Sequence, residues 1–171
     1  TFCISKNNSK TKSKLKLQHI ILNMANNLLH VLLADDDEDD RLFFKDAFEE
    51  IKIQTQVKFV HDGLQLMEHL LHPDTVLPNI LFLDLNMPKM TGHECLAEIK
   101  KNNKLKDLIV AIYSTSSSEE DIEETFVKGA NIYIKKPNDF NSLKKIISEV
   151  ITLNWHYHTS GLNRDNFLLR L

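Results

Sequence analysis

Acidic, hydroxyl and ammonium side chains stand at or just beyond the ends of four short apolar segments. They are Asp35, Asp36 and Asp37 after residues 30–34, Asp84 after 80–83, Ser114 after 108–112, and Lys135 and Lys136 after 132–134. Carboxylates gathered in one place repel one another, so they either raise a pKa or hold a hard cation. Ligands that are all oxygens, without His or Cys beside them, favour Mg²⁺. A carboxylate beside Mg²⁺ and a lysine can attack a phosphoryl donor as a nucleophile.

These segments belong to a regular alternation of strands and helices. The apolar runs and alternating patterns predict strands at 30–34, 57–60, 80–83, 108–112 and 132–134. Apolar residues at helical spacing predict helices at 39–51, 64–71, 93–101, 119–128 and 140–154. The fold class is therefore α/β, a doubly wound (βα)5 parallel sheet with helices on both faces. Ligands bind outside the carboxyl ends of such strands, so the side chains named above are expected to meet at one edge.

Composition excludes several classes of function. The chain has 171 residues, and its first 23 contain five lysines and no acid, which leaves 16 basic and 24 acidic residues in the rest. A body with a net charge of −8 does not suit a protein that binds nucleic acid by neutralising phosphates. No apolar run approaches the length needed to span a bilayer, so no membrane partner is expected. Two cysteines form no disulfide framework, which fits a cytoplasmic protein, and four scattered glycines build no phosphate loop.

Three segments are predicted along the chain. Residues 1–27 read as a disordered basic leader, part of which could lie upstream of a natural start at Met24. The central domain is expected at 28–154. Residues 155–171 form a C-terminal extension whose apolar patch, 167–169, must be buried either on its own chain or on a second copy.

The last predicted helix has more apolar residues than one buried face requires. Beside Leu143, Ile147 and Val150, a neighbouring stripe contains the residues Ile146, Leu153 and Tyr157. A stripe of this kind facing solvent indicates a surface for a protein partner.

Several separated motifs resemble the receiver domains of two-component response regulators, of the chemotaxis-regulator type. The motifs are Leu33-Ala34-Asp35-Asp36, Leu81-Phe82-Leu83-Asp84-Leu85-Asn86-Met87-Pro88, Met90-Thr91-Gly92, Ser114, Gly129-Ala130 and Tyr133-Ile134-Lys135-Lys136-Pro137. The resemblance covers about residues 28–153, and short receivers that partner bacterial phytochromes are the most similar. It implies a flavodoxin-like strand order of 2-1-3-4-5.

The resemblance also implies a role for each matching residue. Asp84 would be the phosphoacceptor, and Mg²⁺ would be held by the carboxylates of Asp35, Asp36 and Asp84 with the backbone carbonyl of Asn86. The acid run 35–40 leaves open which pair binds the metal, with Asp36 preferred as the direct ligand and residues 37–40 read as a helix start. Lys136 would pair with the phosphoryl group, and its bond to Pro137 would be cis. Ser114 would be the switch hydroxyl and Tyr133 the switch aromatic, which turns inward on phosphorylation.

The implied function is that of a stand-alone response regulator rather than an enzyme that turns over substrate. It would receive a phosphoryl group from a sensor histidine kinase or a histidine phosphotransfer protein. Asn86 and Ser116 lie where the family tunes the hydrolysis of the phosphoaspartate. The output would reach a downstream protein target through the fourth helix, fifth strand and fifth helix. A homodimer through that face or through the C-terminal tail is also expected.

Two functions of other classes were weighed against this one. Asp35, Asp37, Asp39 and Asp46 have the spacing of a Ca²⁺-binding loop, but Asp40 occupies the position where the loop needs glycine. An aspartate-nucleophile phosphohydrolase would have Asp-x-Asp after the strand. Here the second acid is replaced by Asn86, which cannot act as the acid or base that turnover requires.

Overall fold

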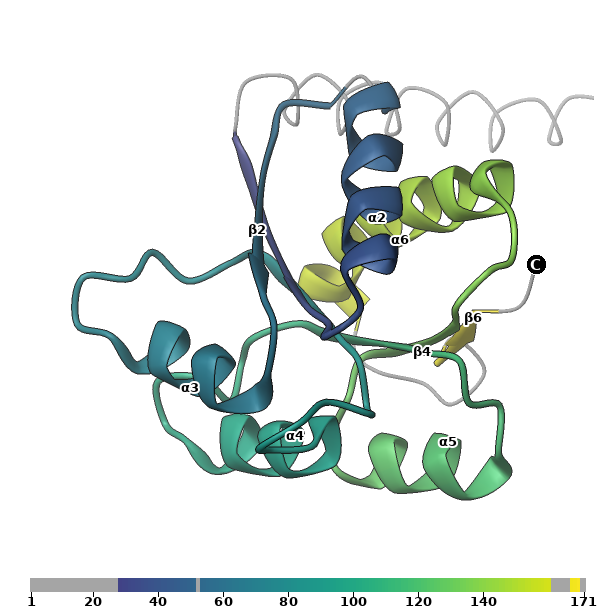
Figure 1. Cartoon of the computed structure of the whole chain (residues 1–171). Coiled ribbons are helices and arrows are strands. Elements are labelled where there is room, and N and C mark those ends of the chain that lie inside the picture. Colours follow the sequence, from purple (N-terminus) through teal and green to yellow (C-terminus); the bar gives the residue numbers. More distant parts are fainter. Residues whose placement is uncertain (1–27, 52, 161–166, 170–171) are drawn as a thin grey trace, which may run out of the picture.

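Strands and helices alternate along the chain in the computed structural model, which describes residues 28–51, 53–160 and 167–169 (Figure 1). The strands are β1 (Leu29–Ala34), β2 (Thr55–Val60), β3 (Ile80–Leu83), β4 (Val110–Ser114), β5 (Ile132–Lys135) and β6 (Leu168–Leu169). The helices are α2 (Glu38–Glu50), α3 (Gly63–Leu71), α4 (Gly92–Lys101), α5 (Glu119–Val127) and α6 (Phe140–Ser160). The five predicted strands and five predicted helices are thus all present. Strand β4 lies two residues later than predicted, and α6 continues to Ser160.

The sheet is parallel throughout, in the order β2-β1-β3-β4-β5-β6. The predicted order of the first five strands, 2-1-3-4-5, is confirmed. The prediction of a five-stranded sheet was one strand short, because β6 pairs with β5 through residues 168 and 169. Two residues are too few to show a strand period in the sequence. Their strand geometry depends on the edge that β5 offers them.

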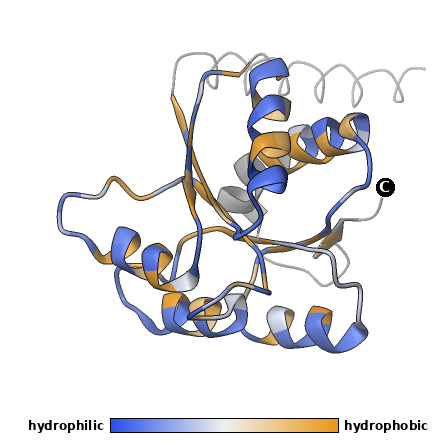
Figure 2. Ribbon diagram, in the orientation of Figure 1, coloured by the Kyte–Doolittle hydropathy of each residue, from blue (hydrophilic) through white to orange (hydrophobic). Residues whose placement is uncertain are grey.

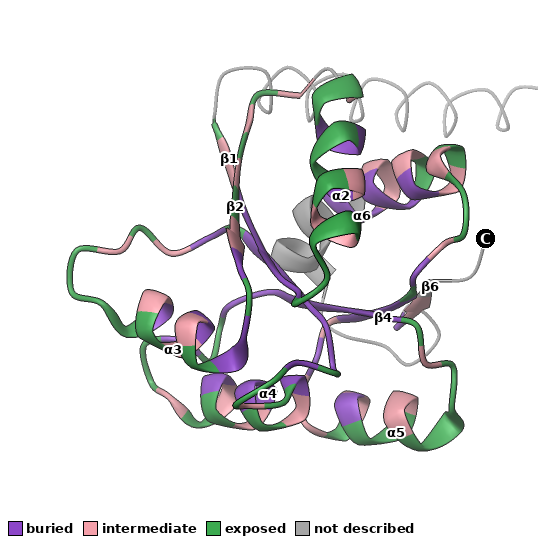
Figure 3. Cartoon of the chain, in the orientation of Figure 1, coloured by how far each residue is buried: buried purple, intermediate pink, exposed green. Residues whose placement is uncertain are grey.

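Two layers of helices enclose the sheet (Figure 1). Helices α3, α4 and α5 cover one face, and α2 and α6 cover the other. Successive residues of β3 alternate between two hydrophobic cores: Leu81 and Leu83 pack with α3 and α4, whereas Ile80 and Phe82 pack with α2 and α6. Figures 2 and 3 show the same division, with the apolar and largely buried strands β1, β3, β4 and β5 between helices that are polar and exposed on their outer sides. A strand buried on both faces explains the continuous apolar run in the sequence.

Local hydrogen bonds fix where three of the helices begin. Asp37 is the N-cap of α2, where its side chain accepts from the backbone N–H groups of residues 39 and 40. Thr91 and Glu94 form a capping box at α4, and Ser118 caps α5, where its side chain accepts from the backbone N–H of Asp121. The start of α4 passes close to the end of β3 at Gly92. Any side chain there would clash, because a Cβ at this position would lie 2.1 Å from the backbone oxygen of Asp84.

Residues 167–169 pack against the edge of the domain at β5. Phe167 is 1% exposed and packs against Phe126 and Tyr133, with ring centroids 5.0 and 6.2 Å away. The backbone N–H of Tyr133 donates to the carbonyl of Phe167 at 2.7 Å. Of the two burial sites expected for the patch 167–169, the structure therefore shows Phe167 buried on its own chain.

One expectation for the last helix is wrong. Ile146 is 4% exposed and belongs to the core beneath α6, so it does not lie on a solvent-facing stripe. Ile146 and Ile147 both reach this core because the apolar face of α6 is wider than one line of residues. The side chains of Leu153 and Tyr157 and the leader 1–27 lie outside the described residues. In the part of the chain that is described, no helix is both long and apolar enough to cross a membrane.

Candidate functional site

The carboxylates of β1 and β3 meet at the carboxyl edge of the sheet. The backbone N–H of Asp35 donates to the carbonyl of Val60, and that of Asp84 donates to the carbonyl of Ala34, so the sheet's hydrogen bonds hold both residues in register. Ligand oxygens of Asp35, Asp36 and Asp84 all lie within 4.8 Å of one another. Asp35 and Asp84 are buried, whereas Asp36 is exposed and opens the cluster to solvent. The structure thus brings together the three acids that the sequence singled out.

Lys136 reaches into this cluster from the end of β5. Its Nζ lies 2.8 Å from Asp35 Oδ2, 2.7 Å from Asp40 Oδ2 and 3.0 Å from Asp84 Oδ2. Burial disfavours its ammonium charge, but the contacts with Asp35 and Asp40 outweigh burial and raise the pKa of Lys136 above its ordinary value. Lys136 is therefore a buried, permanently charged group beside Asp84, while its neighbour Lys135 is exposed.

The carboxylate of Asp35 has a raised pKa. Burial raises the pKa of Asp35 to about 6, and the charge of Asp84 adds to the rise, although Lys136 opposes it. Its Oδ2 is fully buried and makes no hydrogen bond among the described residues, so it has only the ion pair with Lys136. A buried carboxylate oxygen with so little compensation is a suitable ligand for a cation.

The donor set fits a hard divalent cation. The three clustered acids offer only oxygens, and Asp36 gives access from solvent. These are the ligands that Mg²⁺ and Mn²⁺ prefer. The backbone N–H of Asn86 donates to Asp84 Oδ1 at 3.3 Å, which places Asn86 next to the cluster. A contribution from the carbonyl of Asn86 stays a prediction.

Two residues of the site were missed by sequence reasoning. Asp40 was assigned with the helix start, yet its carboxylate bonds to Lys136 from the first turn of α2. Arg41 Nη1 donates to the backbone carbonyl of Asp35 at 2.7 Å. A helix that begins at residue 38 directs its first turn toward the same sheet edge, which is the signal that could have identified Asp40.

Ser114 and Tyr133 lie on neighbouring strands beside the acid cluster. Ser114 is fully buried, and its Oγ accepts from the backbone N–H of Ser116 at 3.2 Å. Tyr133 is also fully buried, and its hydroxyl donates to the carbonyl of Ser116 at 3.3 Å. The ring of Tyr133 lies inside in this structure and is covered in part by Phe167, and its movement on phosphorylation stays a prediction.

The predicted cis bond between Lys136 and Pro137 is also wrong, since the described residues contain no cis peptide bond. The trans form is intrinsically favoured for X–Pro bonds. Lys136 keeps its place because its backbone N–H donates to the carbonyl of Ser114 at 2.8 Å.

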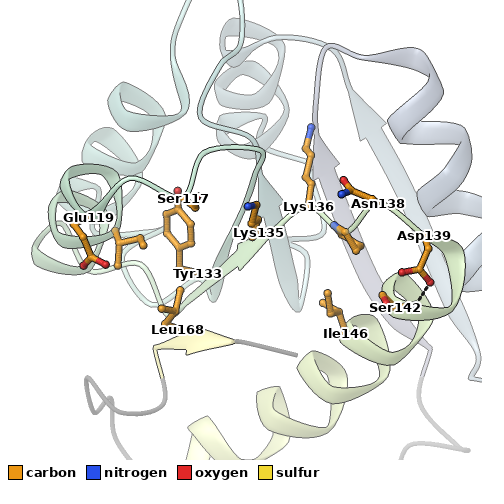
Figure 4. A pocket seen from close by; sticks show the side chains of 12 residues that line it. Ser117, Glu119, Tyr133, Lys135, Lys136, Asn138, Asp139, Ser142, Ile146 and Leu168 are labelled. Carbon is orange, nitrogen blue, oxygen red and sulfur yellow. Dashed lines mark hydrogen bonds between the residues drawn. The ribbon is translucent and has the colours of Figure 1, made fainter.

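A groove of about 560 Å³ lies beside the acid cluster, between the loop after β4, the end of β5, the start of α6 and strand β6 (Figure 4). Tyr133 and Leu168 line one part of it, and Asp139 and Ser142 line another. The groove is therefore on the face that the sequence assigned to a protein partner, and the chain's own tail borders it.

Known proteins share both the sequence and this fold. The family model of the response regulator receiver domain matches residues 31–148. Response regulator Rcp1 of Synechocystis sp. is 31% identical over 124 residues, covering 70% of this chain and 84% of Rcp1. The probable methanogenesis regulatory protein FilR2 of Methanothrix harundinacea is 31% identical over 123 residues, covering 70% of this chain and 79% of FilR2.

Two solved structures have the same architecture. The Mn²⁺-bound form of Rcp1 has a TM-score of 0.68 and 29% identity, covering 79% of this chain and 99% of that one. The phosphorylated cyanobacterial phytochrome response regulator RcpA has a TM-score of 0.71 and 29% identity, covering 80% and 99%. With its strand order, its acid cluster and these relatives, the chain belongs to the response regulator receiver domains of two-component systems.

Proposed function

We propose that Asp84 accepts a phosphoryl group from a sensor histidine kinase or a histidine phosphotransfer protein, with Mg²⁺ held by Asp35, Asp36 and Asp84. The observation that carries this proposal is the position of Asp84, whose Oδ2 lies 3.0 Å from a buried lysine inside the acid cluster. The solved structures of RcpA, phosphorylated, and of Rcp1, with Mn²⁺, support the same chemistry.

The residues of the site offer the groups that phosphoryl transfer needs from the protein. A carboxylate oxygen of Asp84 attacks phosphorus while the bond from phosphorus to the donor's histidine nitrogen breaks, and that nitrogen keeps the electron pair. Lys136 Nζ neutralises charge on the equatorial oxygens in the transition state. Mg²⁺ held by Asp35, Asp36 and Asp84 would add a second cationic centre that stabilises the developing charge. Asn86 N–H and Lys136 Nζ hold the two oxygens of Asp84 in place before the attack.

The phosphoryl group then acts as a signal. Ser114 lies at the end of β4, and its hydroxyl moves toward the phosphoryl oxygens, which alters the loop between β4 and α5. The output is a change in protein–protein contacts on the face of α5, β5 and α6. These elements are the fourth helix, fifth strand and fifth helix that the sequence predicts. A downstream protein is the partner, and a homodimer can form through the same face or the tail. This switch operates in the cytoplasm and does not turn over substrate.

Incubation with acetyl phosphate and Mg²⁺, followed by intact mass, tests the proposal. The parent protein should gain about 80 Da, the mass of one phosphoryl group, and EDTA should prevent the gain. Asp84→Asn should abolish labelling, and Asp36→Ala should reduce it severely. Asp46→Asn removes a carboxylate from the exposed side of α2 and serves as the control that labels normally. Labelling of Asp84→Asn at the parental level would show that another residue is the phosphoacceptor.

A further inference from the structure

Three groups of one loop residue, Ser116, are tied to three different elements. Its backbone N–H donates to Oγ of Ser114 on β4, and its carbonyl accepts from the hydroxyl of Tyr133 on β5. Its own hydroxyl donates to Oδ2 of Asp121 in the first turn of α5. The loop between β4 and α5 is therefore connected at one point to the proposed switch hydroxyl, to the buried aromatic and to a helix of the output face.

Asp121 extends this connection to a second helix. Besides the hydroxyl of Ser116, it accepts from the hydroxyl of Ser118 at 2.8 Å and lies 3.2 Å from Nε2 of His93 on α4. The other ring nitrogen of His93 lies 3.5 Å from Glu124, one turn further along α5. The Ser116 hydrogen bond, as the largest of these effects, holds the pKa of Asp121 below its ordinary value. Asp121 is thus an ionised acceptor between the loop, α5 and α4.

We propose that Asp121 is a positioning residue that holds the β4–α5 loop through Ser116 and transmits its movement to α4 through His93. The inference rests on the proposed function, in which the hydroxyl of Ser114 moves toward a phosphoryl group on Asp84. We call the hydrogen bonds from Ser116 to Ser114 and to Asp121 the loop latch.

The geometry requires the loop latch to change when Ser114 moves. The backbone of Ser114 is held by its pairing with Lys135 and by the N–H of Lys136, so its hydroxyl and the following loop must provide the movement. If the hydroxyl leaves Ser116, the first bond of the latch is lost. If Ser116 follows the hydroxyl, the bond to Asp121 is lost. Either way, the latch favours the arrangement seen here and opposes the phosphoryl-bound one.

The contribution of the latch can be measured separately from that of the N-terminal cap of α5. In the cap, the backbone N–H of Asp121 donates to Ser118 Oγ at 3.1 Å, and Asp121→Ala keeps that group. Glu120 is an exposed acid in the same turn, so Glu120→Ala removes the same charge from the helix start without touching Ser116. A difference between these two variants therefore reports the latch and not the helix dipole.

The test is titration of the full chain with beryllofluoride in Mg²⁺, with the apparent Kd measured by calorimetry. Since the latch opposes the bound arrangement, Asp121→Ala should bind beryllofluoride about threefold to tenfold more tightly than the parent. Glu120→Ala should match the parent, and Asp121→Asn, whose amide oxygen can still accept from Ser116, should lie close to it. Ser116→Ala should bind as tightly as Asp121→Ala, and the double variant should show no further gain. Equal affinity of Asp121→Ala and the parent, or additive effects in the double variant, would overturn the proposal.

The transmission to α4 has its own measurement. The ring signals of His93 in NMR spectra should shift when the parent binds beryllofluoride, and this shift should disappear in Asp121→Ala although binding persists. A shift of equal size in that variant would show that α4 responds by another route. A parent protein that neither binds beryllofluoride nor labels on Asp84 would refute the proposed function itself. If the parent binds beryllofluoride and the Asp121 and Ser116 variants bind it with the same affinity, only the latch is refuted.

Discussion

Replacement of Asp35 by asparagine should stabilise the protein at neutral pH in the absence of divalent cations. The pKa of Asp35 is raised from 3.8 to about 6 in the folded chain, because its carboxylate is buried. The folded chain therefore binds a proton at Asp35 more tightly than the unfolded chain does. This stabilisation is complete below about pH 4 and is lost as the pH rises through about 6. A shift of about 2 pH units corresponds to about 3 kcal/mol, which the ionised carboxylate costs the fold at pH 7 and above.

Urea unfolding in EDTA, at a series of pH values between 4 and 8, measures this difference. The free energies of unfolding of Asp35→Asn and the parent should be similar near pH 4 and diverge by about 3 kcal/mol at pH 7.5, with the variant more stable. Added Mg²⁺ should stabilise the parent and not the variant, because the cation compensates the buried charge. Asp46→Asn, an exposed acid, should follow the parent at every pH. If the difference in the free energy of unfolding does not depend on pH, or if the variant is less stable at pH 7.5, the destabilisation does not come from the charge of Asp35.

Three further outcomes are expected. Lys136→Met should slow labelling by acetyl phosphate about a hundredfold, because one positioned donor is lost, whereas Lys135→Met at the exposed neighbouring position should not. Phe167→Ala should lower the free energy of unfolding in urea by about 3 kcal/mol, because it removes a buried ring. It should also speed hydrogen exchange of the Tyr133 amide, which donates to the carbonyl of Phe167, and an unchanged exchange rate would contradict the packing of residues 167–169 on β5. Light scattering over a concentration series should show beryllofluoride increasing self-association of the full chain, and a chain that stays monomeric in every condition removes the homodimer.

The sequence predicted the elements and the acid cluster because both depend on local rules. Continuous apolar runs such as 80–83 occur in strands buried on both faces, and the ends of parallel strands meet at one edge. That rule alone brings Asp35 and Asp84 together. Asp40 could not be assigned in the same way, because helix-capping preferences also explain an acid at its position. Only the direction of α2 against the sheet distinguishes a cap from a partner of Lys136.

Contacts between elements that are distant in sequence were beyond local rules. Nothing in the spacing of His93 and Asp121 indicates that α4 and α5 bring them within 3.2 Å. The pairing of 168–169 with β5 likewise depends on an edge that exists only after the sheet has formed. The expected exposure of Ile146 was wrong for a related reason, because the burial of a side chain depends on what packs against it from other segments. Phe167 covers part of the Tyr133 ring, and the sheet covers Ile146.

The difference between local rules and contacts across distant elements also separates the two tasks of a receiver domain, which are phosphoryl transfer and switching. Phosphoryl transfer needs a few charges at one sheet edge. Asp35 and Asp84 directly follow the paired strands β1 and β3, and Lys136 follows β5, while Asp40 reaches the same edge from α2. Switching needs an arrangement that one added group can displace, so its bonds must be few and individually modest. Ser116 meets that requirement, because a single loop residue joins the ends of β4 and β5 to α5 through three hydrogen bonds. The sequence therefore predicts the acid edge together with Ser114 and Tyr133, whereas the hydrogen bonds of Ser116 are seen only in the folded chain.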